Sequence, residues 1–184
     1  MRVAALVALL LWASIACADL EQAWSELRDG QAVLLMRHAS APGIGDPPGF
    51  VLEDCDTQRN LDEQGRLQAQ RWGELLRAKG VTQPRVFSSR WCRALETAEK
   101  MRFDAVEPLP LLDSFFVRKD QKDTQTENLR AFINSLSAGS PVILITHQVN
   151  ITALTGVFPR SGEALFLALP LTDSPKIQAR ILPP

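Results

Sequence analysis

Ala32-Val33-Leu34-Leu35-Met36 and Val142-Ile143-Leu144-Ile145 are the two stretches of sequence that decide the fold. The first leads into Arg37-His38 and the second into Thr146-His147, and these two histidines are the only ones in the 184-residue chain. A short continuous apolar run is typical of a strand buried in a parallel sheet. Ligands of open α/β sheets bind at the carboxyl ends of the strands. The two histidines and the adjacent arginine therefore predict an anion-binding site at that edge.

The composition is that of one ordinary globular domain, with 46% hydrophobic and 22% charged residues. The net charge of -1 leaves no basic surface typical of nucleic-acid binding. The sequence contains no CxxC or HxxxH pattern and no cluster of histidine and cysteine, so we expect neither a metal site nor a bound cofactor.

Residues 1–18 have the features of a cleaved signal peptide. Arg2 gives a positive start, residues 3–15 are almost continuously apolar, and Ala16-Cys17-Ala18 fits a cleavage site. Two alternatives are a retained membrane anchor and lipidation of Cys17, although Ser14 stands where lipoprotein signals usually have leucine. Cleavage would leave one domain, residues 19–184, with no membrane span. It would remove one of 20 basic and none of 21 acidic residues, leaving a net charge of -2.

Export would leave two cysteines, Cys55 and Cys92. An even pair in an oxidising compartment is a reasonable disulfide candidate. The alternative is two free thiols, one on a loop and one buried on a helix.

The remaining sequence predicts alternating helices and strands, which is typical of a three-layer α/β/α sandwich with a mainly parallel central sheet. Residues 39–58 are rich in Pro, Gly and Asp and predict a long functional loop. Asp62 is the expected N-cap of a helix to Lys79, Ser88 or Ser89 caps the next helix to Met101, and Thr124 with Glu127 predicts a capping box. The other expected elements are helices at 21–29 and after Val149, and strands at 85–87, 105–107, 164–169 and 177–182.

Four segments together resemble the histidine phosphatase superfamily, whose fold is phosphoglycerate mutase-like. They occur in the family's order along the mature chain. Leu35–Ala39 is similar to its Arg-His-Gly signature, Asn60–Ala69 to Leu-Thr-x-x-Gly-x-x-Gln-Ala, Ser88–Ala98 to Ser-Ser-x-x-x-Arg-Ala-x-x-Thr-Ala, and Thr146-His147 to Thr-His-Gly. Ala39 and Gln148 depart from the family, which has glycine at both positions.

The resemblance implies a metal-independent phosphatase that forms a phosphohistidine on His38. A neutral imidazole, held by a hydrogen bond from Nδ1, would attack phosphorus through Nε2. Arg37 and Arg93 would bind the phosphoryl oxygens, and so would His147 if the site's negative charge protonates it. Arg90 is expected to be a solvated helix residue.

Two further residues are candidate substrate contacts. Arg59 lies close to the long loop, and Gln148 follows the second histidine. The proton donor is expected to be Asp113, because Leu111-Leu112-Asp113-Ser114 comes closest to the family's Leu-x-Glu pattern. Glu107 is the alternative.

The chain lacks the large insertions of mutases and phytases, which favours an open site and a simple hydrolase. We expect an exported phosphomonoesterase, periplasmic in a bacterium, acting on a small phosphorylated substrate. By analogy with short exported members, that substrate is a phosphorylated sugar of the envelope lipopolysaccharide. Two alternatives are a non-catalytic protein that binds a phosphoryl ligand, and a metal-dependent hydrolase using His38, His147 and Asp113.

Overall fold

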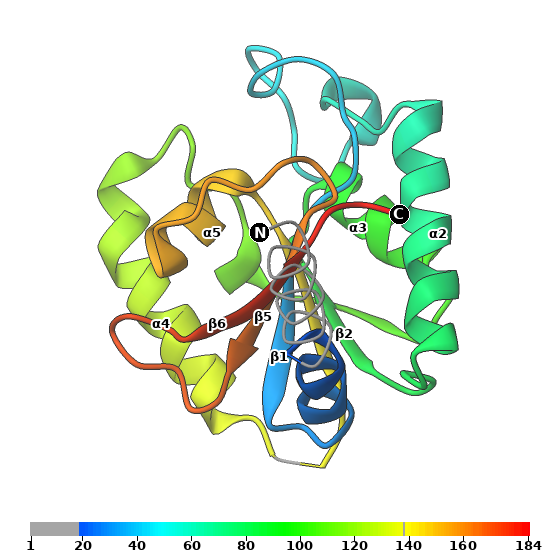
Figure 1. Ribbon diagram of the computed structural model, residues 1–184. Helices are drawn as coiled ribbons and strands as arrows, with labels where there is room; N and C mark the ends of the chain where they lie inside the picture. Colours follow the sequence, from blue (N-terminus) through cyan, green and yellow to red (C-terminus); the bar gives the residue numbers. More distant parts are fainter. Residues whose placement is uncertain (1–18, 138) are drawn as a thin grey trace, which may run out of the picture.

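The computed structural model describes residues 19–137 and 139–184, and its centre is one twisted sheet (Figure 1). The sheet order is β3-β2-β4-β1-β5-β6. Strands β1, β2, β3 and β4 run parallel, whereas β5 and β6 pair antiparallel. The strands are β1 (Ala32–Arg37), β2 (Arg85–Ser88), β3 (Val106–Pro108), β4 (Val142–Thr146), β5 (Ala164–Ala168) and β6 (Ile177–Ile181). The expected mainly parallel α/β fold is confirmed.

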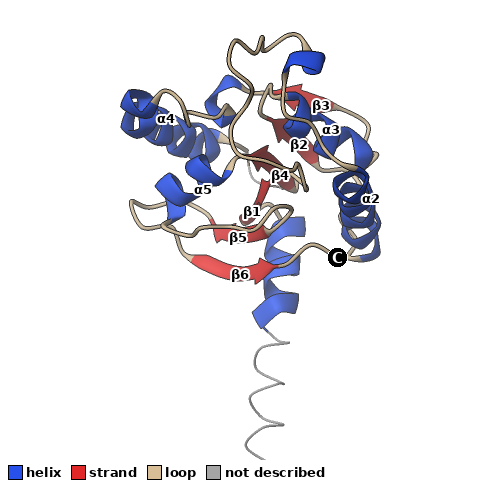
Figure 2. Cartoon of the chain, turned by 90° about the horizontal axis from the view of Figure 1, so that it is seen from above, coloured by secondary structure: helices blue, strands red, loops and turns tan. Residues whose placement is uncertain are grey.

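Helices cover both faces of the sheet, giving three layers (Figure 2). The helices are α2 (Glu63–Ala78), α3 (Cys92–Lys100), α4 (Lys122–Ser135) and α5 (Gln148–Thr155), and residues 19–28 are also helical. Trp24 and Trp72 belong to the core of one face, with residues of α3. Ile133 of α4 and Ile151 of α5 belong to the core of the other. No helix in the described ranges is long and apolar enough to cross a membrane.

The two decisive apolar runs pair directly in the middle of the sheet. β1 and β4 lie in register from Val33 opposite Val142 to Arg37 opposite Thr146. All five residues of β4 and the first five of β1 are buried, which explains their unbroken apolar sequences. Both histidines follow immediately, and the His38 amide donates to the Thr146 carbonyl at 2.9 Å. The register therefore places the two histidines at one sheet edge.

Helix starts agree with the sequence only in part. Asp62 caps α2 as expected, since its Oδ1 accepts a hydrogen bond from the Gly65 amide at 2.6 Å. The expected capping box at Thr124 is wrong, because α4 begins three residues earlier, after Gln121, with no side-chain cap. The expected serine cap of α3 is also wrong, because this helix begins later, after the N-cap Trp91, which makes no side-chain capping bond. The expected signal peptide at 1–18 lies outside the described residues.

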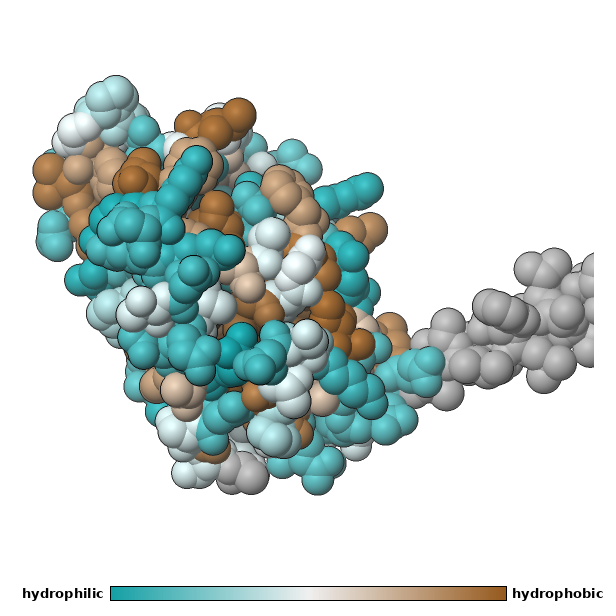
Figure 3. Space-filling view, turned by 90° about the vertical axis from the view of Figure 1, so that its left-hand side faces the viewer, coloured by the Kyte–Doolittle hydropathy of each residue, from teal (hydrophilic) through white to brown (hydrophobic). Residues whose placement is uncertain are grey.

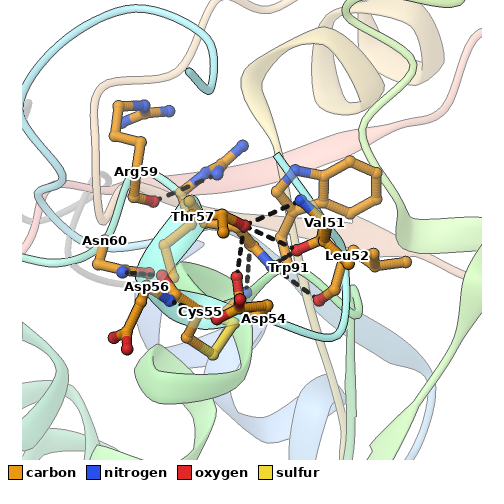
Figure 4. The surroundings of a disulfide bond; sticks show 12 residues. Val51, Leu52, Asp54, Cys55, Asp56, Thr57, Arg59, Asn60 and Trp91 are labelled. Carbon is orange, nitrogen blue, oxygen red and sulfur yellow. Dashed lines mark hydrogen bonds between the residues drawn. A yellow bond between two sulfur atoms is a disulfide. The ribbon is translucent and has the colours of Figure 1, made fainter. Parts of the chain in front are cut away.

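A disulfide joins Cys55 to Cys92, with an S–S distance of 1.99 Å, and fixes the long loop to the start of α3 (Figure 4). The loop segment around Cys55 folds on itself, because the Thr57 hydroxyl accepts from the Val51 amide and donates to the Asp54 carbonyl. The amide of Cys92 also donates to Gln58 Oε1 at 3.1 Å. The loop is therefore held beside the helix that carries Arg93.

Replacing both cysteines with serine should lower the free energy of unfolding by about 4 kcal/mol. The two cysteines are 37 residues apart, and the chain-entropy argument gives that value for a loop of this length. Urea unfolding would measure the difference, with the wild type under reducing conditions as the matched control. Equal stability of variant and oxidised wild type would contradict the expectation.

Candidate active site

His38 is held from three directions at the end of β1. Its side chain is buried, and Nδ1 lies 2.8 Å from the Ala39 carbonyl oxygen. The turn that supplies this carbonyl is fixed from two helices: the Ala39 amide donates to Thr97 Oγ1 of α3, and the Ser40 amide donates to Gln68 Oε1 of α2. The segments Asn60–Ala69 and Ser88–Ala98, which resemble two of the family's motifs, therefore help to orient His38.

The surroundings of His38 keep its imidazole neutral. Burial lowers the pKa of His38 well below 6.5, and the positive charges of Arg93 and Arg37 lower it further. Because a carbonyl can only accept a hydrogen bond, Nδ1 carries the proton and Nε2 keeps its lone pair. A neutral imidazole with a free Nε2 can act as a nucleophile.

His38 lies in a cavity of about 300 Å³ at the carboxyl edge of the sheet. At roughly 30 Å³ per water molecule, this space is larger than a phosphoryl group alone requires. Three arginines give the cavity a cationic floor, which also contains the two histidines. These residues are Arg37, His38, Arg59, Arg93 and His147. The loop after β1, drawn in cyan in Figure 1, and the orange loop after α5 both contribute residues to the lining of this cavity.

The arginines of the floor leave hydrogen-bond donors free for an anion. Arg37 donates from Nη1 to the Pro159 carbonyl at 3.0 Å. The Nε atoms of Arg37 and Arg93 are buried without a partner among the described residues. Such unpaired buried donors are costly, and an anion would satisfy them. The expected phosphate ligands therefore meet at one place.

Arg59 also lines the cavity, as expected for a candidate substrate contact. Its Nε donates to the Gly45 carbonyl at 2.8 Å, and its Nη1 donates to the Ala41 carbonyl. Burial and the nearby charge of Arg93 lower the pKa of Arg59 to about 10. The group stays charged at neutral pH and adds to the positive field.

His147 is buried beside Arg93 and is neutral in the structure. Burial lowers the pKa of His147 well below 6.5, and the charge of Arg93 lowers it further. The protonated form of His147 is expected only when a bound anion supplies negative charge, and it stays a prediction. Nδ1 of His147 faces Arg93 Nη2 at 3.5 Å and can only accept there, so Nε2 carries the proton and donates to Ser89 Oγ at 2.8 Å.

Asp113 does not line the cavity, which corrects its expected role as proton donor. Its Oδ2 accepts from Arg90 Nε at 2.8 Å and Nη2 at 2.6 Å, and its Oδ1 accepts from the Arg90 amide and from Ser89 Oγ. Arg90 is thus an ion-pair partner rather than a freely solvated residue. The Leu-x-Glu likeness placed Asp113 near the site but could not show which way its carboxylate points.

The contacts assign Asp113 to positioning His147. A chain of hydrogen bonds runs from His147 Nε2 through Ser89 Oγ to the Asp113 carboxylate. The alternative donor Glu107 lies on β3, half exposed, and pairs with Arg85 at 3.5 Å. Among the described residues, no group of three His, Cys, Asp or Glu side chains converges as a metal site would require.

The Asp113→Asn variant should slow alkyl and aryl phosphates by a similar factor, roughly 10- to 100-fold. The substitution weakens the hydrogen-bond chain that orients His147, and this effect does not depend on the leaving group. Steady-state rates with methyl phosphate and phenyl phosphate would test it. A loss confined to the alkyl ester would mean that Asp113 donates the proton after all.

Asp46 is the one carboxylate among the described residues that line the cavity, and sequence reasoning missed it. It accepts from Arg93 Nη1 at 2.6 Å and Nη2 at 3.2 Å, and from Trp91 Nε1 at 3.0 Å. Burial alone would raise the pKa of Asp46, but the hydrogen bond and charge of Arg93 lower it. An acid in the middle of a glycine-rich loop was the only signal in the sequence.

The Asp46→Asn variant should bind inorganic phosphate about 10-fold more tightly than the wild type. The carboxylate occupies the face of Arg93 that a phosphate dianion would use, so the anion must displace it. Isothermal titration with phosphate measures the change, with Asp54→Asn, on the same loop but outside the cavity, as the control. Weaker binding by Asp46→Asn would show that the carboxylate does not compete.

Comparisons with known proteins agree with this fold. The sequence model of the histidine phosphatase superfamily (branch 1) matches residues 33–115, which include His38, Arg93 and Asp113 but not His147. No curated protein matches the chain in sequence.

Three solved structures are similar at low sequence identity. The protein histidine phosphatase SixA complexed with tungstate is 19% identical over 83% of this chain and 97% of its own, with a TM-score of 0.57. Phosphoserine phosphatase from Entamoeba histolytica, solved with 3-phosphoglyceric acid, is 12% identical over 81% and 95%, with a TM-score of 0.56. The mycobacterial glucosyl-3-phosphoglycerate phosphatase is 16% identical over 80% and 96%, with a TM-score of 0.53. Residues 33–115 thus match the histidine phosphatase superfamily in sequence, and the chain shares its fold with these solved structures.

Proposed function

We propose that the protein is a phosphomonoesterase that hydrolyses a phosphate ester through a phosphohistidine on His38. The observation that carries this proposal is the state of His38 itself. Its imidazole is buried and neutral, its Nδ1 is bound to the Ala39 carbonyl, and it lies in a cavity with three arginines. A neutral nucleophile beside fixed positive charge suits phosphoryl transfer, which depends mainly on placement and charge.

The reaction proceeds in two displacements. The Nε2 lone pair forms a bond to phosphorus, and the P–O ester bond breaks with its electron pair on the leaving oxygen. Water then attacks the phosphohistidine, the P–N bond breaks, and the neutral imidazole and inorganic phosphate are released. The guanidinium groups of Arg37 and Arg93 stabilise charge on the phosphoryl oxygens through both steps.

Asp46 is the proposed proton donor in place of Asp113. When a phosphate dianion takes the face of Arg93, the Asp46 carboxylate loses its cation and faces negative charge, and both changes favour its protonated form. An alkoxide leaving group needs such a proton, whereas a phenol leaves without one. On this reading, Asp46→Asn binds phosphate more tightly and yet hydrolyses alkyl esters more slowly.

The proposed place of action is the periplasm of a bacterium, after removal of residues 1–18. The Cys55–Cys92 disulfide supports an oxidising compartment, since such bonds are rare in the cytosol. The proposed substrate is a small phosphorylated molecule, and a phosphorylated envelope sugar is the specific proposal made by analogy.

The test is turnover of phenyl phosphate by the purified mature chain with and without EDTA. We expect hydrolysis at the same rate in both. Loss of activity with the chelator would favour a metal-dependent hydrolase. Tight phosphate binding with no turnover of phenyl or alkyl esters would favour a phosphoryl-binding protein, a role that the ionised state of Asp46 would also fit.

A further inference from the structure

The mouth of the cavity is apolar, in contrast to its cationic floor. Four of the seven large apolar side chains that are exposed in the described part of the chain line this one opening. They are Ile44, Phe116, Val117 and Phe158, which are 91%, 43%, 69% and 70% exposed. We call these four residues the apolar rim. Figure 3 shows hydrophobic residues at the upper end of this face of the molecule.

The apolar rim comes from three separate loops. Ile44 belongs to the loop after β1, Phe116 and Val117 follow the 3-10 helix Pro110–Leu112, and Phe158 follows α5. Single exposed apolar residues are ordinary, but a group gathered at one cavity is typical of a binding surface. The packing of a single helix or strand does not explain why side chains from three loops meet at this opening.

Apolar surface continues from the rim to the catalytic floor. Phe50 and Trp91 also line the cavity, and their rings lie 5.8 Å apart between centroids. The Trp91 ring lies 5.5 Å from that of His147. An alkyl chain or aromatic ring attached to a bound phosphate would therefore contact apolar side chains from the floor of the cavity to its mouth.

Two polar side chains that line the cavity each form a hydrogen bond within their own segment. The Ser114 hydroxyl accepts from the Phe116 amide at 3.3 Å, and the Gln148 amide donates to Thr152 Oγ1 at 2.8 Å. A polyhydroxylated leaving group such as a free sugar would need several hydrogen-bond partners there. The described residues favour burial of carbon instead.

We propose that the substrate is a phosphate monoester whose ester oxygen carries an alkyl or aryl group, which the apolar rim contacts. The inference rests on the proposed function, because the phosphate must lie on the cationic floor for the carbon part to reach the rim. It narrows the substrate class: a phosphosugar would qualify only with an apolar substituent near its phosphate.

Binding of alkylphosphonates tests the inference without turnover. Phosphonates keep the phosphoryl group but have a P–C bond that this reaction does not break. We expect the Kd of methyl-, butyl- and hexylphosphonate to fall about twofold to fourfold per added methylene, as partial to full burial of each CH₂ gives. Phenylphosphonate should also bind more tightly than methylphosphonate. Comparing it with the alkylphosphonates shows whether the rim prefers an aromatic ring or an alkyl chain.

A variant of the apolar rim and a matched control variant distinguish this contact from nonspecific hydrophobic binding to the protein surface. The double variant Val117→Ser with Phe158→Ser should flatten the dependence on chain length while leaving the Kd of inorganic phosphate within about twofold. Leu182→Ser removes another side chain that is 53% exposed but does not line the cavity, so it should keep the wild-type dependence. All three positions are exposed, so folding should be unaffected.

The results overturn the inference if Kd does not change along the series, if the rim variant keeps the slope, or if glucose 6-phosphate binds more tightly than hexylphosphonate. Turnover of phenyl phosphate combined with a flat series would reject the apolar rim alone. A sloped series without any turnover would reject the phosphatase but keep the rim as a ligand contact. Absence of binding by inorganic phosphate and every phosphonate would reject both.

Discussion

Replacing His38 with alanine should reduce kcat/KM for phenyl phosphate by about 10⁴–10⁶-fold, as loss of a nucleophile does in other enzymes. The variant removes the only neutral imidazole with a free Nε2 that the described contacts place in the cavity, because His147 uses Nε2 to bind Ser89. The cationic floor remains, so inorganic phosphate should still bind. Steady-state kinetics and phosphate titration on the same preparation would separate the two effects.

A His147→Ala variant is the comparison for His38→Ala. His147 is as deeply buried, so both substitutions leave a cavity of similar kind. His147→Ala should weaken turnover by a smaller factor, because that side chain assists without forming the P–N bond. Near wild-type turnover by His38→Ala would exclude the phosphohistidine. Equal losses with no phosphate binding in either variant would indicate misfolding, which near-UV circular dichroism would show.

Replacing Arg93 with alanine should weaken phosphate binding by roughly 10- to 150-fold, the equivalent of 1.5–3 kcal/mol for one lost charge-assisted contact. Two changes act in the same direction. The guanidinium that faces the anion is removed, and Asp46 stays behind as a carboxylate without its partner. Vanadate binding should weaken in parallel, because both anions use the same donors.

Arg90→Ala is the contrasting variant for Arg93. Arg90 does not line the cavity, so phosphate affinity should change by less than about threefold. Its loss leaves the buried Asp113 without its main partner and should lower stability by on the order of 1–3 kcal/mol. Arg93→Lys, which keeps charge but loses the planar fork, should fall between alanine and wild type. Equal effects of Arg90→Ala and Arg93→Ala on phosphate Kd would contradict the assigned roles.

The floor of the site could be predicted from the sequence because its position follows from the pairing of two buried strands. β1 and β4 are continuous apolar runs, and parallel pairing brings the residues after them together whatever the loops do. His38, Arg37 and His147 could therefore be placed from the sequence alone. Arg93 followed from the resemblance of Ser88–Ala98 to the family's Ser-Ser-x-x-x-Arg-Ala-x-x-Thr-Ala segment.

Asp113 and Asp46 show where sequence reasoning stopped. Asp113 was placed in the right neighbourhood, but its carboxylate is taken by Arg90, 23 residues away, and such a pairing has no local sequence signal. Asp46 reaches Arg93 across 47 residues through a loop whose path depends on the Cys55–Cys92 disulfide and on Arg59. Local patterns do not encode contacts of this kind.

The apolar rim escaped prediction for the same reason. Ile44, the pair Phe116-Val117 and Phe158 lie in three separate loops, and none stands in a periodic pattern. Only the tertiary arrangement gathers them at one opening.

The most direct test of the account is to trap the phosphoenzyme. Mature protein is mixed with ³²P-labelled phenyl phosphate at pH 7, quenched within the first turnover, digested and mapped. Burial and the charge of Arg93 lower the pKa of His38 well below 6.5, so its imidazole is neutral and able to react at this pH. The account predicts an acid-labile, base-stable adduct on His38, absent from His38→Ala. Label on Ser88 or Ser89, or turnover with no adduct on His38 at any time, would contradict it.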